Sequence, residues 1–176
     1  MKKLLIILLT LLSFMANGAP AHSQLPVALP KVIRDGPAKV AVKMFREGRR
    51  AAAVELARSL SESGDPDASF LVAFSMEGKE PAKLSRGQAM DYYYRKAAAA
   101  GHPEAELRRR LISLGAGEEK ERSEGRQALE AAAVNDPRAS RILGEAWLRG
   151  LMGGKPDRAK AEQCWKDAGE KGDTHS

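Results

Sequence analysis

The chain of 176 residues contains one cysteine, Cys164, so it cannot form an internal disulfide and has no CxxC motif. Its fold therefore has to be held together by packing. Cys164 follows Ala161 and precedes Trp165 and Ala168 in a segment with helical spacing. We interpret its thiol as a small buried apolar group rather than a reactive nucleophile.

Histidine is also scarce. His22, His102 and His175 are the only three; they lie in the lead-in, at an inter-repeat turn and in the tail, without the fixed spacing of metal ligands. His102 occupies the turn position at which Asp65 and Asp136 stand elsewhere in the chain, which favours a turn role. The chain has no serine-nucleophile elbow and no phosphate-binding loop. We therefore expect no catalytic residue, no metal and no cofactor.

Two further motifs are weaker. Glu118, Glu119 and Glu121 could form a carboxylate pair, but they flank a glycine-containing loop where nothing would remove water from them. The glycine-rich segment 150–154 lacks the lysine and hydroxyl residue of a phosphate loop. We interpret the acids as a solvated charge run and the glycines as the end of one helix and the turn to the next.

The sequence beyond Pro37 also lacks the alternating, β-branched runs that predict strands. Alanine, leucine, arginine, lysine and glutamate dominate instead, and these are the strongest helix formers. Aromatic residues make up only 5% of the chain. The composition predicts an all-α fold.

The N-terminus has the pattern of a secretory signal peptide at 1–21. Lys2 and Lys3 precede an apolar run at 4–12, and Ala-Pro-Ala follows at 19–21. The run is shorter than the roughly 20 residues that a membrane helix needs, although a retained anchor is the alternative. No cysteine stands directly after the cleavage site, which disfavours a lipid anchor. We expect export to the periplasm or beyond, with no stable membrane span after cleavage.

Cleavage lowers the formal net charge from +6 to +4, because two lysines leave with the leader. The remaining charges alternate in sign, and no aromatic-basic motif accompanies them. We therefore predict no nucleic-acid partner. Residues 22–37 contain three prolines and predict an extended, flexible lead-in, which could serve as a spacer or lie along the rest of the protein.

A punctuation pattern then recurs: Gly64-Asp65-Pro66, Gly101-His102-Pro103, Asn135-Asp136-Pro137 and Gly172-Asp173. The spacings are 37, 34 and 37 residues, which is typical of an α-solenoid of helical hairpins. Segments 68–101 and 139–172 align without a gap and place apolar or small residues three and four apart. The third unit is the least regular. We predict about four antiparallel helix-turn-helix repeats over 38–172, with a short tail at 173–176.

These residues resemble the Sel1-like repeat, a relative of the tetratricopeptide repeat. The last unit matches the pattern most fully, at Ala139, Leu143-Gly144, Trp147, Gly150, Asp157, Ala161, Trp165, Ala168 and Gly172. The second unit matches at Ala68, Tyr93-Tyr94, Ala97-Ala98 and Gly101. Arg109 and Arg110 replace leucine-glycine in the third unit, so its register departs from the pattern.

The resemblance implies a right-handed superhelix whose concave face binds a protein or peptide, and secreted members are common in bacteria. Carried over by position, that face comprises Asp67, Phe70, Phe74, Glu77, Arg138, Arg141, Glu145 and Leu148. Aromatic and arginine residues are frequent anchors of interfaces. We expect a non-enzymatic module for protein–protein interaction in the cell envelope. The sequence does not predict its oligomeric state.

Two alternatives remain. Cysteine-rich secreted relatives are connected with penicillin binding, so one is a cell-wall or penicillin-interacting enzyme on the same scaffold. This chain lacks their cysteines. The other is an adaptor or inhibitor whose proline-containing lead-in occupies its own binding face.

Overall fold

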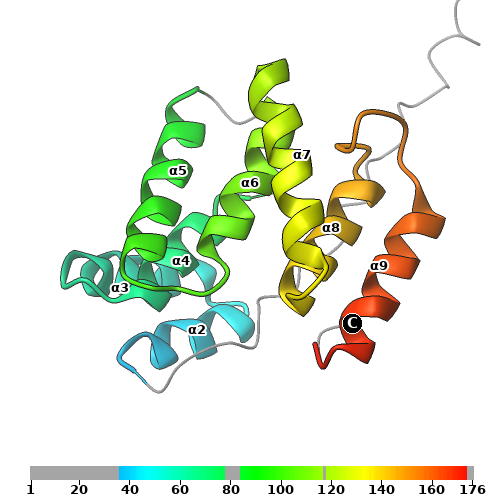
Figure 1. Cartoon of the computed structure of the whole chain (residues 1–176). Coiled ribbons are helices and arrows are strands. Elements are labelled where there is room, and N and C mark those ends of the chain that lie inside the picture. The colour runs from blue at the N-terminus through cyan, green and yellow to red at the C-terminus, as the bar shows by residue number, and fades with distance from the viewer. Residues whose placement is uncertain (1–35, 78–83, 117, 174–176) are drawn as a thin grey trace, which may run out of the picture.

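The computed structural model describes residues 36–77, 84–116 and 118–173, which form eight α-helices and no strand (Figure 1). The all-helical prediction is therefore confirmed for this part of the chain. The predicted signal peptide, residues 22–35 of the lead-in and residues 174–176 lie outside it. In chain order the helices are α2 (Ala38–Arg46), α3 (Arg50–Glu62), α4 (Pro66–Phe74), α5 (Leu84–Ala99), α6 (Ala105–Ala116), α7 (Glu119–Ala133), α8 (Pro137–Leu148) and α9 (Arg158–Glu170).

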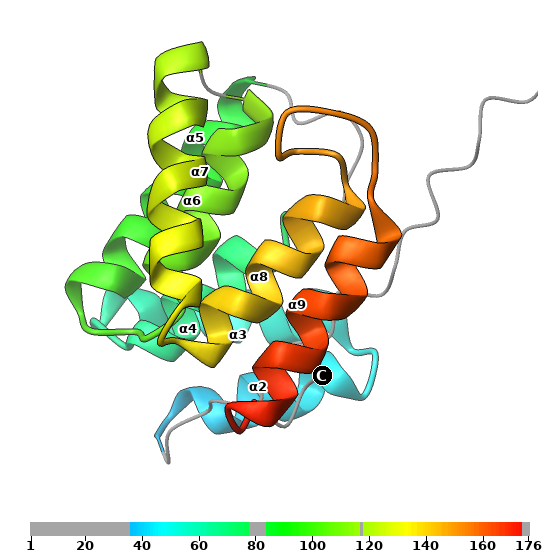
Figure 2. The same ribbon diagram turned by 45° about the vertical axis from the view of Figure 1, so that its right-hand side comes forward.

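Each helix packs against the next one along the chain, as a helical repeat requires. The helices follow one another across the molecule, from α3 and α5 through α6 and α7 to α8 and α9 (Figures 1 and 2). Two further pairs pack together, α2 with α4 and α6 with α8. Of the helices that follow a turn mark, α6 and α8 thus contact one another directly. None of the helices in the described ranges is long and apolar enough to span a bilayer.

The punctuation marks are helix starts. The Asp65 carboxylate accepts the Ala68 N–H at 2.9 Å, and the Asp136 carboxylate accepts the Arg138 N–H at 2.9 Å. In both cases a proline follows the capping aspartate, where its missing N–H costs nothing. Asp157 caps α9 in the same way, by accepting the Lys160 N–H at 3.0 Å.

A glycine ends the preceding helix at every mark except the third, where Asn135 stands. Gly64 and Gly101 adopt φ of 91° and 82°, a left-handed conformation that is unfavourable for a residue with a Cβ. The chain can therefore leave one helix and enter the next within a few residues. This geometry explains why glycine and a capping residue recur together.

The core consists of three clusters along the helix order. One lies among α2, α3 and α4, one among α4, α5 and the start of α6, and one among α6, α7 and α8. Tyr94 is fully buried, and Trp147 packs against the last cluster. Both aromatic side chains thus contribute to the core.

Cys164 also packs against the last cluster. Burial raises the pKa of its thiol, which keeps the thiol protonated at neutral pH. This environment agrees with the predicted apolar role.

Helix α8 crosses α9 closely at Gly144. A Cβ at this position would lie 2.5 Å from Nε1 of Trp165, well inside van der Waals contact. The indole N–H donates to the carbonyl of Arg141 at 3.1 Å, which fixes the ring over the small residue. The leucine-glycine pair of the sequence pattern is thus explained by close packing.

The acidic run at 118–121 begins helix α7. The Glu121 side chain accepts the Glu118 N–H at 3.3 Å, and Glu119 is paired with Arg122 and Arg126. Hydrogen bonds from these arginines lower the pKa of Glu119. The acids are exposed, which agrees with their interpretation as a solvated charge run.

Candidate functional site

The aromatic pair of the predicted binding face lies in the core. Phe70 is 3% exposed and Phe74 is 6% exposed. The Phe70 ring stacks on Phe74 and contacts Tyr94 edge to face, while Phe45 packs against Phe74 from α2. A partner would reach these two rings only if the surroundings of α4 moved.

Asp67 is also buried, beside the turn that contains His102. The His102 ring stacks on Phe70 with its centroid 4.0 Å away, and its Nε2 lies 3.8 Å from Oδ1 of Asp67. Its Nδ1 accepts the backbone N–H of Glu104 at 3.2 Å, the contact that an aspartate makes in the other marks. The predicted turn role of His102 is confirmed by this hydrogen bond.

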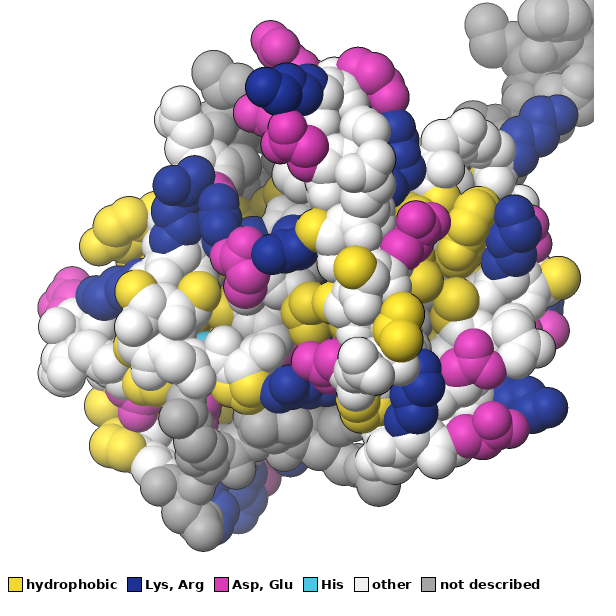
Figure 3. All heavy atoms as spheres, viewed as in Figure 1, with side chains coloured by type: hydrophobic (Ala, Val, Ile, Leu, Met, Phe, Trp, Pro, Cys, Tyr) yellow, Lys and Arg dark blue, Asp and Glu magenta, His cyan; other side chains and the backbone are white. Residues whose placement is uncertain are grey.

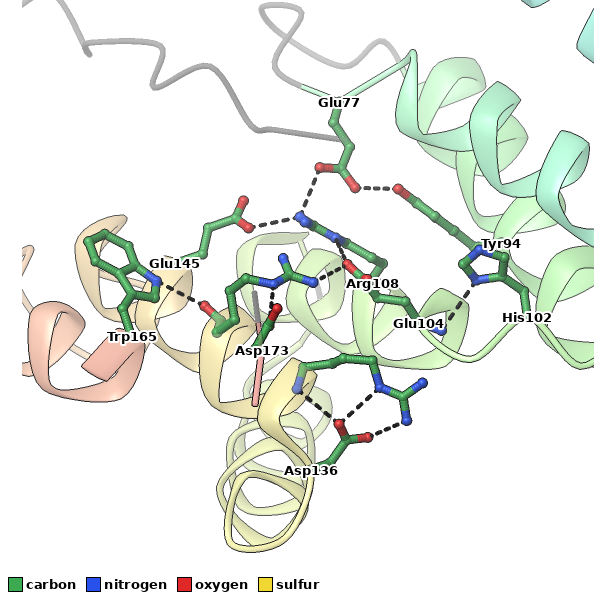
Figure 4. Close-up of polar contacts among 11 residues, drawn as sticks. Glu77, Tyr94, His102, Glu104, Arg108, Asp136, Glu145, Trp165 and Asp173 are labelled. Atoms are coloured by element: carbon green, nitrogen blue, oxygen red, sulfur yellow. Dashed lines mark hydrogen bonds and ion pairs between the residues drawn. The ribbon is translucent and has the colours of Figure 1, made fainter. Parts of the chain in front are cut away.

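Three charged residues of the predicted face, Glu77, Arg141 and Glu145, lie together with three others, Glu104, Arg108 and Asp173. We call this group of six the inner charge cluster (Figure 4). Arg108 of α6 lies at its centre and is completely buried. Its Nε donates to Oε1 of Glu104 at 3.2 Å, and its Nη1 donates to Oε2 of Glu145 at 2.8 Å and to Oε2 of Glu77 at 3.4 Å. One guanidinium thus joins the segment after α4 to α6 and α8.

Arg141 of α8 forms the second centre of the cluster. Its Nη2 lies 2.9 Å from Oε1 of Glu104, and its Nε donates to Oδ2 of Asp173 at 2.9 Å. Asp173 follows α9 and is buried. The cluster therefore extends from the end of α4 to the end of the last helix.

Burial makes the ionisation of this cluster unusual. Desolvation raises the pKa of Glu77, although the charge of Arg108 opposes the rise. Burial alone would lower the pKa of Arg108, but Glu77, Glu145 and Glu104 together raise it. Tyr94, whose hydroxyl donates to Glu77, has its pKa raised well above the usual value by burial and by the Glu77 charge. Arg108 and Tyr94 consequently stay protonated across the physiological range.

Three buried atoms of the cluster have no hydrogen-bond partner within the described residues, namely Oε2 of Glu104, Nη2 of Arg108 and Oε1 of Glu145. The last of these lies in an ion pair with Arg149. Two are acceptors and one is a donor. A buried polar atom without a partner costs about 1–3 kcal/mol. The cluster thus contains buried polar atoms whose hydrogen bonds are not satisfied by the described residues.

The accessible rim of the cluster lies on and beside α8. Arg149 pairs with Glu145, and its side chain is 39% exposed. The Arg138 side chain is 34% exposed and donates to the capping Asp136 through Nε and Nη2. The hydrogen bonds to Asp136 raise the pKa of Arg138, and the charges of Glu104 and Asp173 add smaller contributions.

Of the seven charged and aromatic side chains predicted for the binding face, the structure brings Glu77, Arg141 and Glu145 together. Arg138 lies at the rim, whereas Asp67, Phe70 and Phe74 are buried in the interior. Their role in binding a partner stays a prediction. The accessible charges outside the cluster are of both signs and interspersed on the face shown in Figure 3.

Sequence patterns missed Arg108 and Glu104. Arg108 belongs to the run Arg108-Arg109-Arg110, and its two neighbours are partly exposed and paired with Asp91 or Glu106. The sequence does contain one indication that Glu104 and Arg108 pair, because they are four residues apart and so lie on the same face of a helix. Arg108 also adjoins the apolar Leu107. Nothing in the sequence alone shows that this arginine points inward.

The cluster can orient and hold charged or hydrogen-bonding groups. Within the described ranges, no three His, Cys, Asp or Glu side chains come close enough to hold a metal ion. No protein-family model, no curated protein and no solved structure matches the chain. Its function therefore has to be inferred from its own residues.

Proposed function

We propose that this chain is an exported Sel1-like repeat module that binds a protein or peptide partner in the bacterial cell envelope. In this proposal, four hairpins form a right-handed solenoid: α2 with α3, α4 with α5, α6 with α7, and α8 with α9. The first helix of each hairpin lines the concave side. The observation that carries the proposal is the inner charge cluster, which joins residues of three successive hairpins on the first-helix side.

The pattern of helix packing supports this arrangement. First helices contact one another in the pairs α2–α4 and α6–α8, whereas successive second helices do not pack closely within the described residues. An array curves toward the side on which its repeats are closest. The first helices thus belong on the inside of the curve, where repeat proteins bind extended ligands.

Export is supported by the sequence of residues 1–21. With a single cysteine, the domain is held together by packing and needs no disulfide to fold. This suits a module that has to remain folded outside the cytoplasm.

The binding surface in this proposal is the α8 side of the cluster. Arg138, Arg141 and Glu145 from the predicted set are joined there by Arg149. Arginine is favoured at interfaces because its planar fork binds carboxylates and carbonyls at two points. Phe70 and Phe74 pack in the core cluster of α4, α5 and the start of α6, where the Arg108 guanidinium carbon lies 5.6 Å from the centre of the Phe74 ring.

A pull-down from envelope extract tests the proposal, with the chain lacking residues 1–21 as bait. Neutralising the rim with Arg138→Gln and Arg149→Gln is expected to reduce capture of a specific partner about tenfold or more, because two interfacial arginines are lost. The matched control neutralises two exposed cations of α9, Arg158 and Lys166, whose side chains are 84% and 69% exposed. This control should retain the partner.

Equal capture by both variants would contradict the assignment of the surface. The enzyme alternative has its own test, which is incubation of the purified chain with a penicillin-type acylating probe. A covalent adduct detected by mass spectrometry would replace the proposed function with the enzymatic one.

A further inference from the structure

Basic residues are concentrated at the first helix of the described fold. Residues 36–50, which contain α2 and the turn to α3, carry five Lys or Arg residues and one acid, Glu47. Residues 118–133, which contain α7, carry three Lys or Arg residues and five Glu residues. The charge is therefore unevenly distributed along the fold, with a positive excess at α2.

Helix α2 directs its basic side chains outward. Its buried side packs in the cluster among α2, α3 and α4 and consists of Ala38, Ala41 and Val42. Lys39, Lys43 and Arg46 are exposed. They follow one another at spacings of four and three residues, which places them on one face of the helix, away from the core.

Arg49 extends this face beyond the end of α2. Its Nη2 lies 2.7 Å from Oε2 of Glu47, and Nζ of Lys43 lies 3.9 Å from Oε1 of the same carboxylate. One acid is thus shared by two cations, and the Lys43 side chain is still 76% exposed. We call the four cations Lys39, Lys43, Arg46 and Arg49 the α2 basic face.

An exposed apolar side chain lies beside these cations. Val40 is 59% exposed and stands three residues before Lys43. Met44, one turn further along the helix, is partly exposed. Apolar surface gains free energy when it leaves water. A partner that offers both negative charge and an apolar phase would engage both kinds of side chain.

The surface of an anionic lipid bilayer has both properties. Helices that lie in the membrane interface combine lysine and arginine with apolar groups, and each basic residue near an anionic leaflet strengthens binding about fivefold. The α2 basic face extends along about 10 Å of helix, too far for one phosphate group to pair with every cation. A plane of many headgroups can pair with all of them at once.

We propose that the α2 basic face binds the surface of a bilayer that contains anionic phospholipids. Lipid phosphates pair with the four cations, and Val40 enters the interface between the headgroups. No helix crosses the bilayer in this contact. The inference goes beyond the proposed function and does not depend on it, because the proposed partner surface lies on α8.

Vesicle co-sedimentation tests the proposal with the chain lacking residues 1–21, so that the apolar leader does not contribute. The vesicles consist of phosphatidylcholine with or without about 30% phosphatidylglycerol. At about 0.1 M salt we expect at least tenfold tighter binding to the anionic vesicles. Binding should weaken at about 0.5 M salt, because the ions screen the charges over a shorter distance.

A pair of charge variants tests the position of the face. Lys39→Gln with Lys43→Gln should lower the affinity for anionic vesicles about tenfold or more. The matched variant Arg158→Gln with Lys166→Gln changes the net charge equally on α9 and should alter the affinity less than about twofold. All four side chains are exposed, so circular dichroism should show that both variants are folded.

A valine variant tests the apolar contribution. Val40→Ser should lower the affinity for anionic vesicles about twofold or more, because less apolar surface leaves water on binding. Val134→Ser is the matched control, since Val134 is 65% exposed on the C-terminal side of α7. This control should bind as the unaltered chain does. An unchanged affinity of Val40→Ser would overturn the insertion of Val40.

Several results would overturn the proposal as a whole. Equal binding to neutral and anionic vesicles, or equal losses in the α2 and α9 charge variants, would exclude this face as the lipid site. Preferential binding of soluble poly-glutamate would assign it to an acidic protein. Self-association that disappears with Lys39→Gln and Lys43→Gln, without vesicle binding, would assign it to a second copy.

The two proposals can fail separately. The chain with Arg138→Gln and Arg149→Gln should bind anionic vesicles but lose its protein partner. The chain with Lys39→Gln and Lys43→Gln should show the opposite behaviour. Partner capture without vesicle binding would leave only the proposed function, and vesicle binding without a partner would leave only the lipid site.

Discussion

Glu77 shows how strongly position controls the chemistry of one residue. It lies just beyond the end of α4, where it accepts from Tyr94 and pairs with Arg108. Burial penalises its ionised form and raises the pKa, so the folded protein binds this proton more tightly than the unfolded chain does. The free energy of unfolding therefore falls as the pH rises above 4.5, the pKa of this carboxyl in the unfolded chain.

Glu77→Gln removes this ionisation and keeps an oxygen that can accept from Tyr94. The unfolding free energy of the variant minus that of the wild type should increase from pH 4.5 up to the folded pKa and then stay constant. The slope is at most about 1.4 kcal/mol per pH unit. Urea unfolding followed by circular dichroism across this pH range measures the difference. A flat or falling difference would show that Arg108 outweighs desolvation at this site.

At the scale of single helices, stability depends on how the helix ends are capped and on how closely helices cross. The same capping geometry recurs at Asp65, Asp136 and Asp157, with His102 as the variant at the start of the third hairpin. Each cap satisfies one of the backbone N–H groups that a helix start leaves without a partner. The caps thus fix where each hairpin begins.

Asp65→Ala should lower the unfolding free energy by about 1 kcal/mol, because the Ala68 N–H loses its acceptor. Asp65→Asn keeps an acceptor oxygen at the same place and should cost a few tenths of a kcal/mol. Thermal unfolding of both variants provides the measurement. Equal losses would mean that charge, rather than the cap, accounts for the effect.

The α8–α9 crossing depends on the absence of a side chain at Gly144. Gly144→Ala should destabilise the protein by about 1–3 kcal/mol, because the new Cβ would overlap the Trp165 indole. Gly154 is the control, since a Cβ there would meet no atom within 4 Å and its φ is not left-handed. Gly154→Ala should be neutral or slightly stabilising in chemical denaturation. A neutral Gly144→Ala would indicate that α9 can move away without loss of packing.

At the scale of the whole molecule, Arg108 connects hairpins that are remote in sequence. It contacts Glu77 and Glu145, which lie 31 and 37 residues away on either side. A buried ion pair contributes little net stability compared with apolar residues of similar volume. Removal of one partner is nevertheless strongly destabilising, because the other charge stays buried without compensation. Arg108 therefore acts mainly by specifying how successive hairpins are placed.

Arg108→Ala should cost about 3–5 kcal/mol, since it leaves several buried carboxylates without their cation. Arg109→Ala is the matched control in the same run, because Arg109 is partly exposed and pairs with Asp91 and Glu106. Its loss should cost less than about 1 kcal/mol. Guanidinium chloride unfolding of the two variants gives the comparison. Similar values would refute a central role for Arg108.

The third hairpin illustrates the limits of pattern matching. Arg109 and Arg110 obscured its register, yet α6 still begins at Ala105 as the turn mark predicts. The core leucines Leu111 and Leu114 are buried as their spacing indicates. Local spacing thus survives a mismatch to the family pattern, because helix formation depends on the residues within a few turns.

The sequence by itself determined the helices, their capped starts and the glycines that end them, because these features depend on neighbours within one or two turns. Only the tertiary structure decided that Phe70 and Phe74 lie in the core and that Arg108, Glu104 and Asp173 meet in one buried cluster. These contacts join residues from different hairpins, and their burial and pKa values depend on the packing of the whole array. No periodicity along a single helix contains that information.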